Sequence, residues 1–212
     1  MKKFLISFLF IVSMCSVQAV SLDSVRVSLL TCAPGSEIYA LFGHSAIRYE
    51  NPAQQQDWVF NYGMFSFKEP NFVFRFVKGE TDYQLGVIPF RYFEGEYAMR
   101  GSSVYQQELN LTDAEKIKLI QLLEENYRPA NRVYRYNYFY DNCTTRARDK
   151  IEESIQGKVV YPENEKTLSY RDICMSLPLV VNGVSSVSIC VWEVKPMSRL
   201  MNGNRCLLLF TC

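Results

Sequence analysis

The pattern of apolar and polar positions along the chain predicts mostly short β-strands. Val25 to Leu30 alternates between apolar and polar residues, which is the period of a strand with one buried face. Ser45 to Tyr49 and Asp57 to Tyr62 are predicted as two further strands, and Asn51-Pro52 between them indicates a hairpin. Strands are also expected over three later ranges: Tyr83 to Phe90, Val104 to Leu111 and Val133 to Tyr140.

A capping box predicts the start of the best-defined helix. Thr112 stands three residues before Glu115, so the Thr hydroxyl can accept an orphan amide while the Glu carboxylate returns to the cap. Arg128-Pro129 closes this helix. Its buried face is expected to consist of Leu119, Ile120, Leu122 and Leu123.

A second helix is predicted from Cys143 to about Ile155, with Asn142 as its N-cap. Two other segments have weaker patterns. Ser36 to Leu41 is predicted as a short helix, and Phe65 to Lys78 as an irregular or helical apolar arm. Strands and helices in this arrangement predict one α+β domain.

The first residues are predicted to be a signal peptide and not part of the fold. Met1 to Lys3 is a short basic start, and Phe4 to Met14 is an apolar run that is too short to span a bilayer. Val17 to Ala19 fits a cleavage site, so residues 1–19 are expected to be removed from a chain exported to the periplasm. The alternative is a lipoprotein that is cut before Cys15.

Charge and hydropathy narrow the class of partner. The formal net charge is +1, with both signs mixed along the chain, so no electrostatic argument favours nucleic acid. No later stretch has the length of a membrane span, and the mature chain is expected to be soluble or peripheral at a membrane. The aromatic residues from Phe60 to Phe76 are expected in the core, and the functional alternative is an apolar trough for a lipid chain.

The candidate chemistry lies in one histidine and one cysteine. His44 is the single histidine of the chain, and Cys143 is expected at a helix start, where unpaired amides and the helix dipole favour a thiolate. A thiol enzyme needs a base, and His44 would have to supply it. The alternatives are two structural residues, or a disulfide between Cys32 and Cys143 in an oxidising compartment. A zinc site is disfavoured by the ligand spacing, and no cofactor is expected.

An ordered series of motifs resembles the Lnb-type N-terminal periplasmic domain family, over about residues 25 to 173. The series consists of Phe42 to Arg48, Asn61 to Gly63, Leu109 to Thr112 and Tyr138 to Asp149. The resemblance implies a permuted papain-like fold, shared with the NlpC-like and lecithin:retinol acyltransferase (LRAT) groups, with an antiparallel sheet and a nucleophilic Cys at a helix N-terminus. It implies Cys143, His44 and Asn61 as the catalytic set, with Asn61 orienting the histidine from the next strand.

The activity that the resemblance implies is lipoprotein N-acylation. Cys143 would attack a phospholipid ester and hold the acyl chain as a thioester, and His44 would take the thiol proton and later assist the N-terminal amine of a lipoprotein. The amide of Cys143 would help to hold the oxyanion. Two rivals stay open: a thiol amidase or peptidase acting on peptidoglycan, and an inactive, truncated copy of a longer membrane-bound enzyme.

The end of the chain departs from the family pattern. Family members of this activity have a membrane-embedded C-terminal part, for which this chain offers no candidate segment. Residues 174–212 lose periodicity and contain four of the seven cysteines. One hypothesis is a single-base frameshift between Arg171 and Val181, because permitted codons read in a shifted frame yield family-like motifs. The domain is then expected to span residues 20–173, and the tail to be poorly ordered or misdocked on it.

Overall fold

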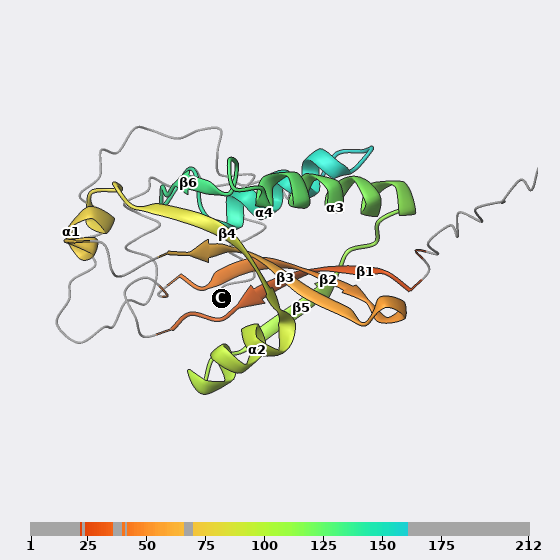
Figure 1. The fold of residues 1–212 in the computed structure, drawn as a ribbon, viewed down its shortest axis with the longest axis horizontal. Helices are drawn as coiled ribbons and strands as arrows, with labels where there is room; N and C mark the ends of the chain where they lie inside the picture. Colours follow the sequence, from red (N-terminus) through yellow and green to blue (C-terminus); the bar gives the residue numbers. More distant parts are fainter. Residues whose placement is uncertain (1–21, 23, 36–39, 41, 66–69, 161–212) are drawn as a thin grey trace, which may run out of the picture.

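The structure is a computed structural model that describes residues 22, 24–35, 40, 42–65 and 70–160. These residues form a six-stranded antiparallel sheet with helices packed on both of its faces (Figure 1). The predicted α+β class and the antiparallel sheet are therefore confirmed.

The sheet contains all six predicted strands, but those that begin at Val104 and Val133 are shorter than predicted. Its members are β1 (Arg26–Cys32), β2 (His44–Asn51), β3 (Gln56–Met64), β4 (Asp82–Pro89), β5 (Val104–Glu108) and β6 (Val133–Arg135). They pair in the order β5-β1-β2-β3-β4-β6. The predicted hairpin is present, because β2 pairs with β3 and a 3₁₀ turn, Pro52–Gln54, joins them.

Helices cover the two faces of the sheet and create two cores. α3 (Asp113–Tyr127) and α4 (Cys143–Ser154) lie on one face, and α2 (Phe90–Met99) lies on the other (Figure 1). Successive side chains of β1 point to opposite faces, so Leu29 packs in the core under α3 and α4 while Leu30 packs in the core under α2. Burial of each leucine contributes ~1.5–3 kcal/mol to folding.

The predicted capping box begins α3. The hydroxyl of Thr112 accepts the amide of Glu115, and the Glu115 carboxylate accepts the amide of Thr112 at 2.9 Å. Leu119 and Leu123 are fully buried against the sheet. Ile120 also packs against that core, although it is only partly buried. The helix is therefore as predicted, but Leu122 of its predicted buried face is only partly buried and is not among the residues packed against this core.

The prediction of a strand over Val133 to Tyr140 is wrong for most of its length. β6 ends at Arg135, and beyond it the chain makes a turn closed by an isolated bridge between Asn137 and Asp141. The cause is the side chain of Asn137, whose oxygen accepts the amides of Phe139 and Tyr140 at 3.0 Å each. An asparagine that satisfies backbone amides in this way competes with the sheet ladder. The turn leads directly into α4.

A helix that the sequence analysis did not predict, α2, follows β4 directly. Its buried residue is Phe93, and Tyr97 packs against the same core one turn later. The spacing of these aromatics indicates a helix, but the predicted strand over Tyr83 to Phe90 included the first residue of α2. Another short helix, α1 (Phe72–Val77), lies within the predicted apolar arm.

Several predictions fall outside the described residues. They are the signal peptide over residues 1–19, the short helix over 36–41 except for residue 40, and the anomalous tail over 174–212. The domain boundaries at 20 and 173 therefore stay predictions. Within the residues that the structure describes, no helix has both the length and the apolar character needed to cross a membrane.

Candidate active site

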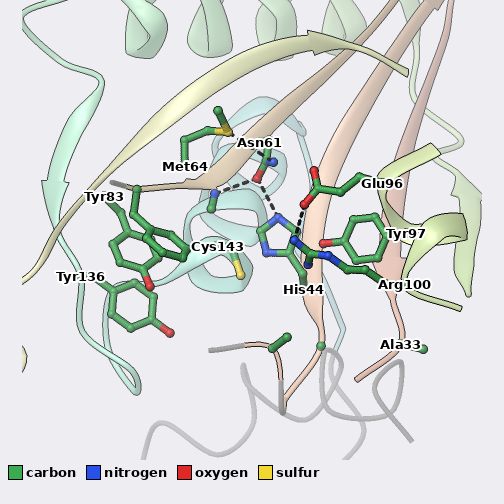
Figure 2. Close-up of a pocket in the computed structure, with 14 residues that line it drawn as sticks. Ala33, His44, Asn61, Met64, Tyr83, Glu96, Tyr97, Arg100, Tyr136 and Cys143 are labelled. Atoms are coloured by element: carbon green, nitrogen blue, oxygen red, sulfur yellow. Dashed lines mark hydrogen bonds and ion pairs between the residues drawn. The ribbon is translucent and has the colours of Figure 1, made fainter. Parts of the chain in front are cut away.

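A cavity of about 300 Å³ opens where the start of β2 and the end of β3 lie beside the start of α4 (Figure 2). The three residues predicted as a catalytic set, His44, Asn61 and Cys143, all line it. His44 and Asn61 come from the β2–β3 hairpin, and Cys143 comes from α4, much later in the sequence. The fold thus brings the whole predicted set to one place.

The local backbone determines where the ring of His44 lies. His44 is the first residue of β2, and Gly43 before it has a φ of 73°, which glycine adopts without the cost that a side chain would impose. The imidazole lies on the α2 side of the sheet, with its centroid 6.4 Å from that of Phe93.

Asn61 holds the ring of His44 in one orientation. Its Oδ1 atom accepts the amide of Gly63 at 2.7 Å and lies 2.7 Å from His44 Nε2. The backbone N–H of Gly63 can only donate, so the Asn61 atom that it contacts must be the side-chain oxygen. That oxygen can only accept, so His44 Nε2 must carry the proton of the hydrogen bond between them. In the neutral ring Nδ1 is left as the acceptor, and in Figure 2 it lies on the Cys143 side.

Cys143 is the first residue of α4, and two polar contacts hold the helix start in place. Asn142 caps the helix, with its side-chain oxygen accepting the amides of Thr144 and Thr145 at 2.9 and 3.0 Å. The hydroxyl of Thr144 lies 3.1 Å from that of Ser45, the residue after His44. This contact ties the start of α4 to the start of β2, and it brings the thiol beside the imidazole.

The surroundings of Cys143 favour its thiolate. Burial alone would raise the pKa of the thiol, but the charge of His44 and a hydrogen bond with its ring outweigh burial. Hydrogen bonds with the Ser45 backbone and the Thr144 side chain act in the same direction, and the pKa of Cys143 falls to about 7. The helix start favours an anion as well.

The surroundings of His44 favour its protonated form. Burial disfavours the charged ring, yet the nearby Cys143 thiolate and hydrogen bonds with Cys143 and Asn61 hold the pKa of His44 above its ordinary value. The two shifts support each other. A thiolate–imidazolium pair is the state expected of an activated cysteine near neutral pH.

Gly63 leaves the space that the His44 ring occupies. A Cβ atom at this position would lie 2.5 Å from His44 Cε1 and 3.1 Å from Nε2. It would also lie 3.1 Å from the Asn61 oxygen. Any side chain here would therefore push the imidazole away from its place between Asn61 and Cys143.

One wall of the cavity is aromatic. Tyr136 stacks on Tyr83 with ring centroids 4.2 Å apart, and Tyr83 stacks on Phe65 at 4.8 Å. Met64 lines the cavity on the same side (Figure 2). Phe60 is buried in the core as expected for the aromatic stretch, whereas Phe65 lines the cavity and Phe74 is 62% exposed, so the core prediction is wrong for Phe74. A wall of stacked rings can hold an apolar chain.

The opposite wall comes from α2 and was missed by the sequence analysis. Glu96, Tyr97 and Arg100 line the cavity, and Glu96 forms an ion pair with Arg100 one helical turn later. The spacing of this charged pair was a signal that could have revealed the helix. Without α2, the sequence offered no reason to place these residues opposite Cys143.

The structure contradicts the alternative of a disulfide between Cys32 and Cys143, because both residues are thiols. Cys32 is fully buried at the end of β1. Burial raises its pKa to about 12, although a hydrogen bond with Tyr97 partly opposes the shift. Among the described residues no group of three His, Cys, Asp or Glu side chains is placed to hold a metal ion.

Comparison with known proteins gives one match. A family model described as the Lnb N-terminal periplasmic domain matches residues 15–173. No curated protein and no solved structure matches the chain. The matched range contains the whole described sheet together with His44, Asn61 and Cys143.

Proposed function

This chain belongs to the Lnb N-terminal periplasmic domain family, and from that premise we propose that it is a periplasmic thiol acyltransferase. An acyl chain would pass from a phospholipid to the N-terminal amine of a lipoprotein through a thioester on Cys143. The observation that supports the proposal is the grouping of His44, Asn61 and Cys143 around one cavity. The same grouping is expected of a permuted papain-like enzyme.

The first half-reaction transfers the acyl group to the enzyme. The Cys143 thiolate attacks the carbonyl carbon of the donor ester, so that a C–S bond forms and the ester C–O bond breaks. The lysophospholipid leaves with the proton that the His44 imidazolium returns to its oxygen. Asn61 keeps the ring in the orientation that this transfer requires, with Nε2 engaged at 2.7 Å.

The second half-reaction transfers the acyl group to the amine. The amine attacks the thioester carbonyl, His44 takes the proton that the nitrogen loses, and the C–S bond breaks. The products are an amide and the regenerated thiolate–imidazolium pair. A pKa of about 7 makes the Cys143 sulfur a good leaving group as well as a nucleophile.

The helix start supplies a group for the oxyanion. The Asn142 side chain accepts the amides of Thr144 and Thr145, and the amide of Cys143 lies one residue nearer the N-terminus of the helix. In the proposed mechanism the Cys143 amide donates to the oxygen of the tetrahedral intermediate. Donors aimed at that oxygen stabilise the transition state by about 3–4 kcal/mol each in enzymes of acyl transfer.

Mass spectrometry of the intact protein and of its proteolytic peptides tests the proposal in two steps. The purified protein is first incubated with phospholipid vesicles, and a mass increase of one acyl chain on the Cys143 peptide is expected. A diacylated lipopeptide with an N-terminal Cys is then added, and the acyl chain is expected on its amine. Cys143→Ser is the control that should form no thioester.

Other products would assign the site to a rival function. Free fatty acid without an acylated amine would indicate a lipid hydrolase, and cleavage of a peptidoglycan stem peptide would indicate an amidase or peptidase on the same pair of residues. A protein that forms no thioester with any ester and whose Cys143 reacts no faster than an ordinary thiol would be an inactive family member.

A further inference from the structure

The α2 wall of the cavity contains a charged pair that has no task in the acyl transfer described above. Glu96 and Arg100 line the same cavity as Cys143 and form an ion pair with each other. The Arg100 side chain is 40% exposed and that of Glu96 is 48% exposed. Water screens such a pair, so its contribution to stability is small, and an anion from outside can replace Glu96 at the guanidinium.

We propose that Arg100 is the anion-binding group of this cavity, and that it takes the phosphodiester of the acyl donor while the donor's ester lies at Cys143. The inference rests on the proposed acyl transfer for the identity of the donor. The anion subsite itself follows from the side chains that line the cavity.

The order of groups across the cavity fits a glycerophospholipid. Figure 2 shows Tyr83 and Tyr136 on one side of Cys143, and Arg100 with its partner Glu96 on the other. In a glycerophospholipid the phosphate and an acyl ester are attached to neighbouring glycerol carbons, and the acyl chain points away from the phosphate. A nucleophile that attacks this ester needs an anion site on one side and an apolar wall on the other.

Arginine suits the phosphodiester better than lysine would. Its planar guanidinium presents a fork of N–H donors that can bind two phosphate oxygens at once. Arg100 is at the C-cap of α2, where the helix end stabilises a cation. That helix-end role alone would not require the side chain to line the cavity.

Arg91, at the other end of α2, is the matched control. It is exposed, its guanidinium lies 4.7 Å from the centroid of the Tyr92 ring, and it is not among the residues that line the cavity. Arg91→Gln therefore removes the same charge from the same helix without changing the wall that faces Cys143.

A first experiment detects the subsite without any acyl transfer. Iodoacetate and iodoacetamide both form a C–S bond with Cys143 and release iodide, but only iodoacetate is an anion. Arg100→Gln is expected to lower the rate with iodoacetate, divided by the rate with iodoacetamide, on the order of fivefold to tenfold. Arg100→Lys should keep most of the ratio, and Arg91→Gln should keep all of it. An unchanged ratio in Arg100→Gln would overturn the subsite.

A second experiment identifies the anion. Thioester formation is measured with phosphatidylglycerol and with diacylglycerol, each in vesicles of the same neutral lipid. Arg100→Gln should raise the apparent KM for phosphatidylglycerol about tenfold, Arg100→Lys should raise it less, and both should leave the diacylglycerol rate unchanged. An equal fall for both donors would show that Arg100 is only structural, and the proposal would be wrong.

Two further outcomes separate the hypotheses. If inorganic phosphate protects Cys143 from iodoacetate while the two lipid donors react equally, the subsite takes free phosphate and the donor assignment is overturned. If no donor forms a thioester but the alkylation ratio still depends on Arg100, the proposed function fails and the anion subsite stands.

Discussion

Cys32 and Cys143 are both near His44, yet their thiols are in opposite chemical states. Cys32 is the Cα partner of His44 across the β1–β2 ladder and is 0% exposed, and burial raises its pKa to about 12. Cys143 is only partly buried at the start of α4, where the charge and hydrogen bond of His44 lower its pKa to about 7. Nearness to a histidine is therefore not sufficient to activate a thiol, because only Cys143 shares a hydrogen bond with the His44 ring.

The element on which each sulfur sits adds to the difference that His44 makes. Cys32 ends a strand whose α2 face packs among apolar side chains such as Leu30 and Ala46, and burial there disfavours a charge. Cys143 begins a helix, where amides and hydroxyls without helical partners stabilise an anion.

The first prediction concerns the two sulfurs themselves. Cys143→Ser should abolish acyl transfer and leave the domain folded, while Cys32→Ala should keep transfer within about twofold because only Cys143 has a thiolate near neutral pH. In the unsubstituted protein, iodoacetamide at pH 7 should label Cys143 at least about a hundredfold faster than Cys32. Peptide mapping by mass spectrometry checks this site by site. Equal labelling of the two cysteines would show that their thiols do not differ in reactivity as described above.

The second prediction removes the base. His44→Ala should lower acyl transfer by about 10²–10⁴-fold, since general acid–base catalysis is lost from both half-reactions. Alkylation of Cys143 at pH 7 should fall less, by roughly three- to tenfold, because the less abundant thiolate is also more nucleophilic. Stopped assays of both rates check the two numbers. Loss of neither rate would exclude His44 from the mechanism.

The third prediction displaces the ring without deleting it. Gly63→Ala puts a Cβ atom 2.5 Å from His44 Cε1, so the imidazole must move away from Cys143. Acyl transfer should fall on the order of a hundredfold, as expected for a misplacement of about 1 Å. Gly95→Ala is the control, because a Cβ there meets nothing within 4 Å. It should keep full activity and raise the melting temperature, since Ala favours a helix over Gly.

The fourth prediction has the smallest effect. Asn61→Ala removes the acceptor that fixes the proton on His44 Nε2. The ring stays in place but can adopt other orientations and the other tautomer, so transfer should fall about tenfold. Asn61→Asp should recover part of the rate, because a carboxylate oxygen can accept the same N–H. Identical rates in the protein with Asn61 and in Asn61→Ala would mean that Asn61 does not orient the base.

The residues of the candidate site were predictable because each has a local signature. The single histidine left no choice of base, and Asn142 before Cys143 indicated an N-cap, so the thiol could be placed at a helix start. Asn61 followed only from the resemblance to a family. Its partner in the structure is the ring nitrogen of His44, a tertiary contact that no local pattern encodes.

The charged wall was missed because it belongs to a helix that was misread as the end of a strand. The strand predicted through Phe90 hid the start of α2, and Gly95 in its middle weakens the helical pattern. The overlong strand after Val133 failed for a similar reason, since the side chain of Asn137 satisfies backbone amides that a strand would have paired. After Val133, therefore, side-chain hydrogen bonds overrode the strand propensity of the segment.

The surroundings of Cys143 lower its pKa to about 7, and its alkylation rate as a function of pH measures that shift most directly. The lowered pKa means that the reactive thiolate is present above about pH 7 and is lost as the pH falls through that value. Site-resolved labelling with iodoacetamide from pH 5 to pH 10 should therefore rise with a midpoint near 7 at Cys143, while Cys32 stays unlabelled. A midpoint at Cys143 of about 8.5, the value of an ordinary cysteine, would contradict the account.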